Sequence, residues 1–180
     1  MFKNIHNWPL EHWHIELCSK CSLKCPRCSR QEVPEGLTNK ELSLKWFKEN
    51  TAGHVVVMGS TTWEDPGMPR PLPKRTNVIA TTRPAEYPSA DKYISGDLNK
   101  SVVQLSEEHP DLITWVIGGP NIIEQTLGVI DEFYLSRIPG AYACDTFLPL
   151  KKIESLFERT YIDDTNELVT FEIWSKRLPK

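Results

Sequence analysis

Two apolar runs in this sequence each end in a glycine turn that leads into a helix-forming segment. Residues 54–58 are followed by Gly59-Ser60-Thr61-Thr62, and residues 113–117 are followed by Gly118-Gly119-Pro120. The three consecutive valines of the first run are typical of a parallel sheet that is covered on both faces. Strand, turn and helix in this order favour an α/β fold.

The glycines at these strand ends also bear on function. At the carboxyl end of a parallel strand, glycine lets backbone N–H groups approach a phosphate, and the helix N-terminus that follows favours negative charge. Either turn alone is also explained by a tight reversal of the chain. A third polar turn, Thr81-Thr82-Arg83, follows another apolar strand. Together the three turns indicate a nucleotide site.

The rest of the chain alternates strands with helices and then continues as strands. A capping box of Thr38 and Glu41 begins a helix that Gly53 ends. Further strands are expected at residues 12–17, 77–81, 91–95, 132–138, 156–161 and 168–174, and further helices at 100–109 and 120–127. We therefore predict one domain, 1–180, with an α/β fold of three layers. Its central sheet is mostly parallel and has an antiparallel C-terminal edge.

Composition argues against several classes of partner. The net charge of −3 gives no general attraction for nucleic acid or for an anionic membrane. No apolar run approaches the ~20 residues that span a bilayer. The first residues lack the apolar core of a signal peptide. We expect a cytoplasmic protein that acts on a small molecule, with neither nucleic acid nor membrane as partner.

Several segments, in this order along the chain, resemble the dihydrofolate reductase family. The clearest are Leu44-Lys45-Trp46-Phe47, Arg70-Pro71-Leu72-Pro73-Lys74-Arg75 and Asp145-Thr146-Phe147-Leu148-Pro149, joined by residues 57–64, 76–79, 116–119, 131–138 and 171–173. The resemblance implies a dihydrofolate reductase-like fold. It also implies NADPH-dependent reduction of dihydrofolate, or of a related pterin, to tetrahydrofolate by hydride transfer.

The same resemblance implies which residues bind each ligand. The residues that would hold NADPH are Gly59, Ser60, Thr61, Thr62, Thr81, Thr82, Arg83, Gly118 and Gly119. Leu44, Phe47 and Leu72 would enclose the pterin and benzoyl groups, and Ser136 would also line the substrate site. Arg75 would pair with the α-carboxylate of the glutamate tail of folate, because a guanidinium fork suits a carboxylate.

The sequence departs from the family at the position of its acid. There the first helix supplies a carboxylate that helps to protonate the pterin, whereas this chain has Ser43. The catalytic proton donor is therefore unknown, with Glu16 or water as alternatives. Basic residues that usually follow the glycine turns are replaced by Ser60 and Asn121. Binding of the 2′-phosphate of the cofactor would then depend largely on Arg83 and Thr82.

Cys21, Cys25 and Cys28 form a C-x3-C-x2-C motif that the reductase resemblance does not explain. Residues 12–43 resemble the first strand, cluster loop and first helix of radical-SAM proteins, which implies a 4Fe–4S cluster on these three thiolates. Zinc bound by four thiolates, with Cys18 as the fourth, is one alternative. Free or reversibly oxidised thiols are another. Because the resemblance covers only the start of that fold, we expect no radical catalysis.

The two resemblances meet in the first helix. We expect residues 12–17 to replace the first strand of the reductase, and the cysteine loop to lie where its mobile loop would. Residues 1–43 would then be an N-terminal segment built into the reductase-like domain. Two other functions stay open, namely a nucleotide- or folate-binding module with weak or no turnover, and an iron–sulfur protein derived from a radical-SAM enzyme. Self-association could cover apolar surface left by an imperfect first strand.

Overall fold

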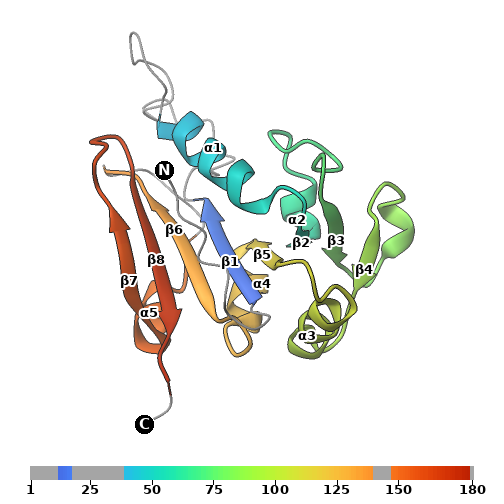
Figure 1. Cartoon of the computed structure of the whole chain (residues 1–180). Helices are drawn as coiled ribbons and strands as arrows, with labels where there is room; N and C mark the ends of the chain where they lie inside the picture. The colour runs from blue at the N-terminus through green and yellow to red at the C-terminus, as the bar shows by residue number, and fades with distance from the viewer. Residues whose placement is uncertain (1–11, 18–38, 140–146, 179–180) are drawn as a thin grey trace.

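One sheet runs through the protein. The computed structural model describes residues 12–17, 39–139 and 147–178, although for 12–17 and 39–41 it describes the backbone alone (Figure 1). The strands of these ranges follow the order β4-β3-β2-β5-β1-β6-β8-β7. Their bounds are β1 His12–Leu17, β2 Val55–Gly59, β3 Thr76–Ala80, β4 Lys92–Ile94, β5 Thr114–Gly118, β6 Glu132–Arg137, β7 Phe157–Asp163 and β8 Thr170–Lys176.

Strand directions confirm the predicted fold class. Every neighbouring pair from β4 to β6 is parallel, whereas β8 is antiparallel to both β6 and β7. The strand predicted at residues 12–17 is β1, and it lies inside the sheet between β5 and β6. Its register pairs Trp13 with Trp115 of β5 and Ile15 with Tyr134 of β6.

Helices cover both faces of this sheet and complete three layers. α1 (Asn39–Thr51) and α2 (Ser60–Trp63) lie on one face, and α3 (Leu98–Glu108), α4 (Pro120–Thr126) and α5 (Leu150–Leu156) lie on the other (Figure 1). Because side chains alternate along a strand, β2 divides its apolar run between two cores. Val55 and Val57 join the cluster under α3 and α4, while Val56 and Met58 join the cluster under α1.

Two elements differ from the sequence-based expectation. α5 and the 3-10 turn η1 (Pro84–Glu86) were not predicted, since the last third of the chain was expected to hold strands and turns only. α5 has 7 residues and buries one side chain, Ile153. A helix of this length shows almost no periodicity in the sequence, so packing against the sheet determines it.

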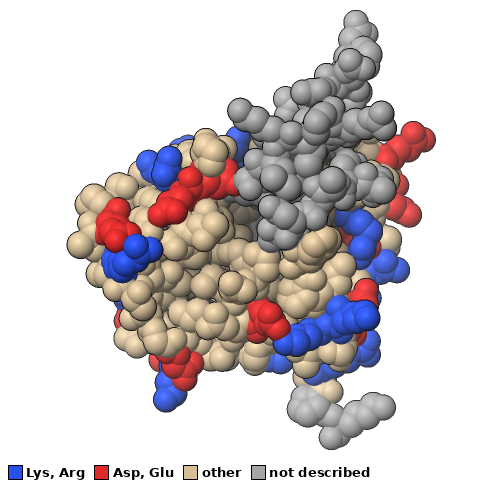
Figure 2. Space-filling model, turned by 180° about the vertical axis from the view of Figure 1, so that it is seen from behind, with Lys and Arg blue, Asp and Glu red and all other residues tan. Residues whose placement is uncertain are grey.

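The expected cysteine loop falls in a segment that the structure does not describe. Residues 18–38 and Cys144 lie outside the described residues. Within the described ranges, no helix combines the length and the hydropathy that crossing a bilayer requires. Figure 2 shows one face of the surface, where acidic and basic side chains lie along the rim of a wide uncharged area.

Candidate functional site

The three turns predicted to bind a nucleotide meet at one edge of the sheet. β3, β2 and β5 are parallel neighbours, so their carboxyl ends lie side by side. In register, Gly59 is paired with Ala80, and Met58 is paired with Gly118 after a shift between Val57 and Met58. This edge of the sheet is the usual place for ligands in parallel α/β folds.

Each glycine turn packs against the helix that follows the other turn. A Cβ atom on Gly59 would lie 3.1 Å from Ile122 Cγ1 of α4, and a Cβ atom on Gly119 would lie 3.4 Å from Thr62 Oγ1 of α2. Gly118 has φ +113°, a conformation that residues with a side chain rarely adopt. Glycine is therefore favoured at position 118 by backbone conformation and at position 59 by close approach. A Cβ atom on Gly59 would require the Ile122 side chain to shift by a few tenths of an ångström, whereas one on Gly119 would make an ordinary contact with Thr62.

The start of α2 has backbone N–H groups that no side chain caps, whereas α4 offers fewer, because Pro120 has no N–H and the Ile122 N–H donates to the Gly119 carbonyl at 3.0 Å. Gly59 and Gly119 are the N-cap residues, and neither helix receives a side-chain cap. Uncapped N–H groups and the positive end of the helix dipole both favour an anion. These turns are therefore the candidates for phosphate contacts, as the sequence predicts.

The third turn is more open. Thr81 donates its N–H to the Ile94 carbonyl at 2.9 Å, and its Oγ1 accepts from the Arg83 N–H at 3.0 Å. The Arg83 guanidinium pairs with Glu86 at 3.0 Å, and both side chains are largely exposed. An exposed pair of this kind is weak, so Arg83 can exchange Glu86 for a phosphate at little cost. Thr82 is exposed beside it.

On the α1 face, aromatic rings join the helix to the sheet. The Trp46 ring lies 5.3 Å from the Tyr134 ring of β6 and 4.8 Å from the Phe171 ring of β8. Phe47 is buried in the same cluster, whereas Leu44 is half-buried one turn earlier. α1 is therefore fixed over β6 and β8 by its own ring contacts.

Two buried hydroxyls lie beyond one end of these ring contacts. Ser43 precedes Trp46 by one helical turn, and Ser136 follows Tyr134 by two residues on the same face of β6. Because α1 runs against the direction of β1 and β6 (Figure 1), both residues lie toward the same end of the helix. Both are fully buried, and neither Oγ has a hydrogen-bond partner among the described residues. Buried hydroxyls are normally paired, so these two mark where a ligand's polar atoms could bind.

Arg75 is held at the other end of α1. Its Nε donates to Thr51 Oγ1 at 2.7 Å, its Nη2 to the Lys48 carbonyl at 3.1 Å and its Nη1 to the Pro73 carbonyl at 2.6 Å. The guanidinium lies 5.5 Å from the centre of the Phe47 ring. Burial lowers the pKa of Arg75 from its ordinary value, yet arginine stays protonated in proteins. These bonds use three of its five N–H donors and leave two for a carboxylate.

The loop that carries Arg75 is fixed by a buried amide. Asn77 accepts from the Leu72 N–H at 2.9 Å and donates to the Leu72 and Arg75 carbonyls, each at 3.0 Å. Asp91 accepts the Asn77 N–H at 2.6 Å. Leu72 is thereby held in the same apolar cluster as Phe47. The structure thus brings Phe47, Leu72 and Arg75 together.

Sequence reasoning missed the residues that orient these groups. The role of Thr51 depends on Arg75, which is distant in the sequence, so the local sequence does not reveal it. Only the hydroxyl-to-carbonyl bond of Thr51 to Phe47 could be expected, from their four-residue spacing. Asn77 gave a clearer signal, because an amide in an apolar strand needs partners nearby. Buried polar residues inside predicted strands are therefore candidates for loop supports.

Other predicted site residues lie outside what the structure describes. Glu16 belongs to β1, where its backbone is in register with Leu135, but its side chain is not described. Cys21, Cys25 and Cys28 lie in the undescribed segment 18–38. Within the described residues, no group of three or more His, Cys, Asp or Glu side chains is arranged to bind a metal ion.

Comparison with known proteins gives the same family for most of the chain. The sequence profile described as "Dihydrofolate reductase" matches residues 37–175. Dihydrofolate reductase from Haemophilus influenzae is 36% identical over 106 residues, and dihydrofolate reductase HdrB from Haloferax volcanii is 34% identical over 112 residues. Each alignment covers 59% of this chain, and they cover 62% and 57% of those relatives.

A solved structure supports the fold. Dihydrofolate reductase from Enterococcus faecalis, complexed with NADP(H) and RAB-propyl, superposes with a TM-score of 0.64 at 20% sequence identity. The superposition covers 95% of this chain and 99% of that one. With a family profile that matches residues 37–175 and a sheet of the same fold, the chain belongs to the dihydrofolate reductase family.

Proposed function

We propose that this protein reduces dihydrofolate, or a related pterin, to tetrahydrofolate with NADPH. The observation that carries the proposal is the reciprocal packing of the two glycine turns at one sheet edge, where Gly59 meets Ile122 and Gly119 meets Thr62. Backbone that is bare of side chains at two uncapped helix starts suits the diphosphate of a dinucleotide. Family membership supports the same reading.

NADPH fits the residues present at this edge. The first glycine turn (Gly59 to Thr62) and Gly118-Gly119 would bind the phosphates, and Thr82 and Arg83 would bind the outer 2′-phosphate. Bound there, the cofactor supplies a hydride to the C=N bond of the substrate. Met58 and Trp63 lie in the same apolar cluster as Phe47 and Leu72, so the cofactor edge borders the α1 face.

The α1 face supplies groups that match the rest of the substrate. Phe47 and Leu72, with the half-buried Leu44 at their edge, would enclose the apolar rings. The two remaining N–H donors of Arg75 would bind the α-carboxylate. The hydroxyls of Ser43 and Ser136 would pair with polar atoms of the heterocycle, since burial without a partner is otherwise costly.

Protonation of the substrate is the step for which this site has no strong acid at position 43. Reduction of the C=N bond adds a hydride to carbon and a proton to nitrogen, so an acid must supply the proton. A serine hydroxyl at position 43 is far too weak an acid. The proton would come from water or from Glu16, and we expect slow turnover.

The test is the loss of NADPH absorbance when dihydrofolate is added to the purified protein. Turnover that depends on both substrates supports the reductase, while NADPH binding without turnover favours the binding-module alternative. A variant with serine at Cys21, Cys25 and Cys28 serves as a control. The reductase proposal expects that variant to keep its NADPH and dihydrofolate activity.

The cysteine motif carries a second, independent proposal. Its C-x3-C-x2-C spacing favours a 4Fe–4S cluster in the N-terminal segment 1–43. Anaerobic purification with iron and sulfide analysis tests it, and zinc analysis tests the alternative metal. A protein without either metal leaves the cysteines as free or oxidised thiols. Cytoplasmic location and self-association also stay predictions, open to cell fractionation and to sedimentation.

A further inference from the structure

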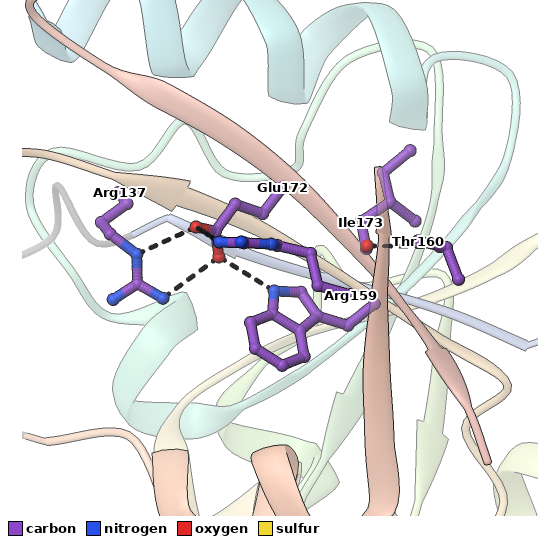
Figure 3. Close-up of polar contacts among 6 residues, drawn as sticks. Arg137, Arg159, Thr160, Glu172 and Ile173 are labelled. Carbon is purple, nitrogen blue, oxygen red and sulfur yellow. Dashed lines mark hydrogen bonds and ion pairs between the residues drawn. The ribbon is translucent and has the colours of Figure 1, made fainter. Parts of the chain in front are cut away.

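A buried carboxylate joins the three C-terminal strands of the sheet. Glu172 of β8 is 2% exposed and receives a two-point fork from Arg137 of β6, with Nε–Oε1 at 3.2 Å and Nη2–Oε2 at 3.1 Å (Figure 3). Arg159 of β7 donates Nη1 to Oε1 at 3.1 Å, and Trp174 donates Nε1 to Oε2 at 2.9 Å. We refer to these four residues as the Glu172 cluster.

The cluster depends on the charge of Glu172. Each carboxylate oxygen accepts two of these bonds, which fills its ordinary acceptor sites. Both guanidiniums bind Oε1, so the carboxylate lies between two positive charges. Without that charge, the two half-exposed guanidiniums would face a buried side chain that carries no counter-charge for either of them.

The cluster lies on the face of β6 and β8 that is opposite to α1. Phe171 and Ile173, the neighbours of Glu172 in β8, pack on the α1 face. In register they are paired with Ser136 and Tyr134 of β6. Arg137 immediately follows Ser136, so the fork fixes the backbone next to that buried hydroxyl.

We propose that Glu172 is a positioning residue, which sets Ser136 for the substrate through Arg137 and supports α1 through its neighbour Phe171. The inference rests on the proposed function, because it assigns the α1 face to the substrate. The cofactor turns belong to β2, β3 and β5, on the other half of the sheet. A substitution in the cluster should therefore weaken the binding of the substrate and leave the binding of the cofactor unchanged.

The test compares Glu172→Gln with two other variants. Glu172→Gln keeps the side-chain shape and removes the charge. Glu172→Gln with Arg159→Gln also removes one of the two facing positive charges, so it should recover part of the loss. Glu158→Gln is the matched control, because it removes an exposed pair at 3.8 Å between β7 and Arg177, the residue that follows β8.

For Glu172→Gln we expect the KM for dihydrofolate to rise about tenfold while kcat changes less than about threefold, a loss of about 1.4 kcal/mol in binding. The Kd for NADPH should stay unchanged. A tenfold change in both the KM for dihydrofolate and the Kd for NADPH, or in neither of them, overturns the positioning role and leaves a purely structural cluster. The double variant should recover at least half of the rise in KM on a logarithmic scale. No recovery would also overturn it.

A second measurement is independent of turnover. Amide hydrogen exchange in Glu172→Gln should accelerate at residues 135–137 and 171–173 and stay unchanged in β2 and β5. If the wild type does not turn over dihydrofolate, the reductase proposal fails. Faster exchange confined to these residues then still supports the mechanical link. Equal exchange in the variant and the wild type refutes it.

Discussion

Arg75 and Thr51 form a relay from the loop before β3 to the end of α1. Arg75 Nε donates to Thr51 Oγ1 at 2.7 Å, and Thr51 Oγ1 donates to the Phe47 carbonyl at 2.8 Å. Thr51 is fully buried, so its hydroxyl has little freedom to turn. The relay sets the plane of the guanidinium fork before any ligand binds.

Thr51→Val should weaken the binding of a ligand carboxylate. The variant keeps the β-branched shape but loses the acceptor for Arg75 Nε, and a hydrogen bond to a charged group is worth about 1.5–3 kcal/mol. We expect folate to bind roughly tenfold more weakly, and a pterin that lacks the glutamate tail to bind as before. Thr160→Val, at an exposed hydroxyl on β7, is the control. Equal weakening of both ligands would place Arg75 away from the tail.

Gly118→Ala should impair both stability and cofactor binding. The φ of +113° at Gly118 costs a residue with a side chain about 1–3 kcal/mol. Thermal unfolding should detect this loss, and titration with NADPH should show weaker affinity because the turn moves. Gly128→Ala is the matched control, since its Cβ would meet Asn99 Oδ1 at an ordinary 3.6 Å. A Gly118→Ala protein with unchanged NADPH affinity would remove this turn from the cofactor site.

Most of the fold could be predicted from local patterns. The valine run of β2 and the two glycine turns predict a parallel sheet, because each of these signals lies within a few consecutive residues. Even β1, which is distant from its partners in sequence, was predicted from its apolar pattern. α5 was missed because its seven residues bury only Ile153. Its helical state depends on packing that no short window contains.

The site residues were harder to predict from the sequence than the fold, for a related reason. Backbone turns such as Gly118-Gly119 show themselves in sequence because only glycine satisfies them. Glu172 does not, since it resembles any exposed glutamate of an edge strand until Arg137 and Arg159 are brought beside it. Its partners lie 35 and 13 residues away. Polar networks therefore need the register of the sheet before they can be recognised.

Glu172 should contribute to stability in a pH-dependent manner. Burial alone would raise the pKa of this carboxyl group, but the bonds from Arg137, Trp174 and Arg159 outweigh it, and the pKa lies below its ordinary value of 4.5. A carboxyl with a lowered pKa stabilises the fold above its unfolded pKa, and this stability is lost as the pH falls through the folded pKa. We therefore expect the wild type to lose stability below about pH 4.5.

Denaturant unfolding at several pH values measures this dependence. The free energy of unfolding of Glu172→Gln should fall less steeply in that acidic range than the wild type's, because glutamine does not titrate. Glu108 and Asp163 also have lowered pKa values, the first mainly from Lys92 and the second from Thr165. Their contribution is common to both proteins and cancels in the comparison. Parallel curves for the two proteins would contradict the assignment.

Ser43→Asp should raise reductase activity. The position is fully buried on the face of α1 that carries Trp46, one turn away, and its hydroxyl has no partner among the described residues. A carboxyl placed there would have its pKa raised by desolvation, so it could hold a proton near neutral pH and deliver it to the substrate nitrogen. Positioned acids contribute about 10²-fold or more to rate, and we expect kcat/KM to gain about that factor and to acquire a new pH dependence.

Ser43→Ala is the control for the same position. Removing an unpartnered buried hydroxyl should leave stability unchanged or slightly improved, whereas a buried aspartate should lower it by about 1–3 kcal/mol. Steady-state rates across pH, together with thermal unfolding, separate the two effects. A folded Ser43→Asp protein whose rate stays flat or falls would mean that α1 presents a different residue to the substrate. The alignment of its first turn with the acid of the family would then be wrong.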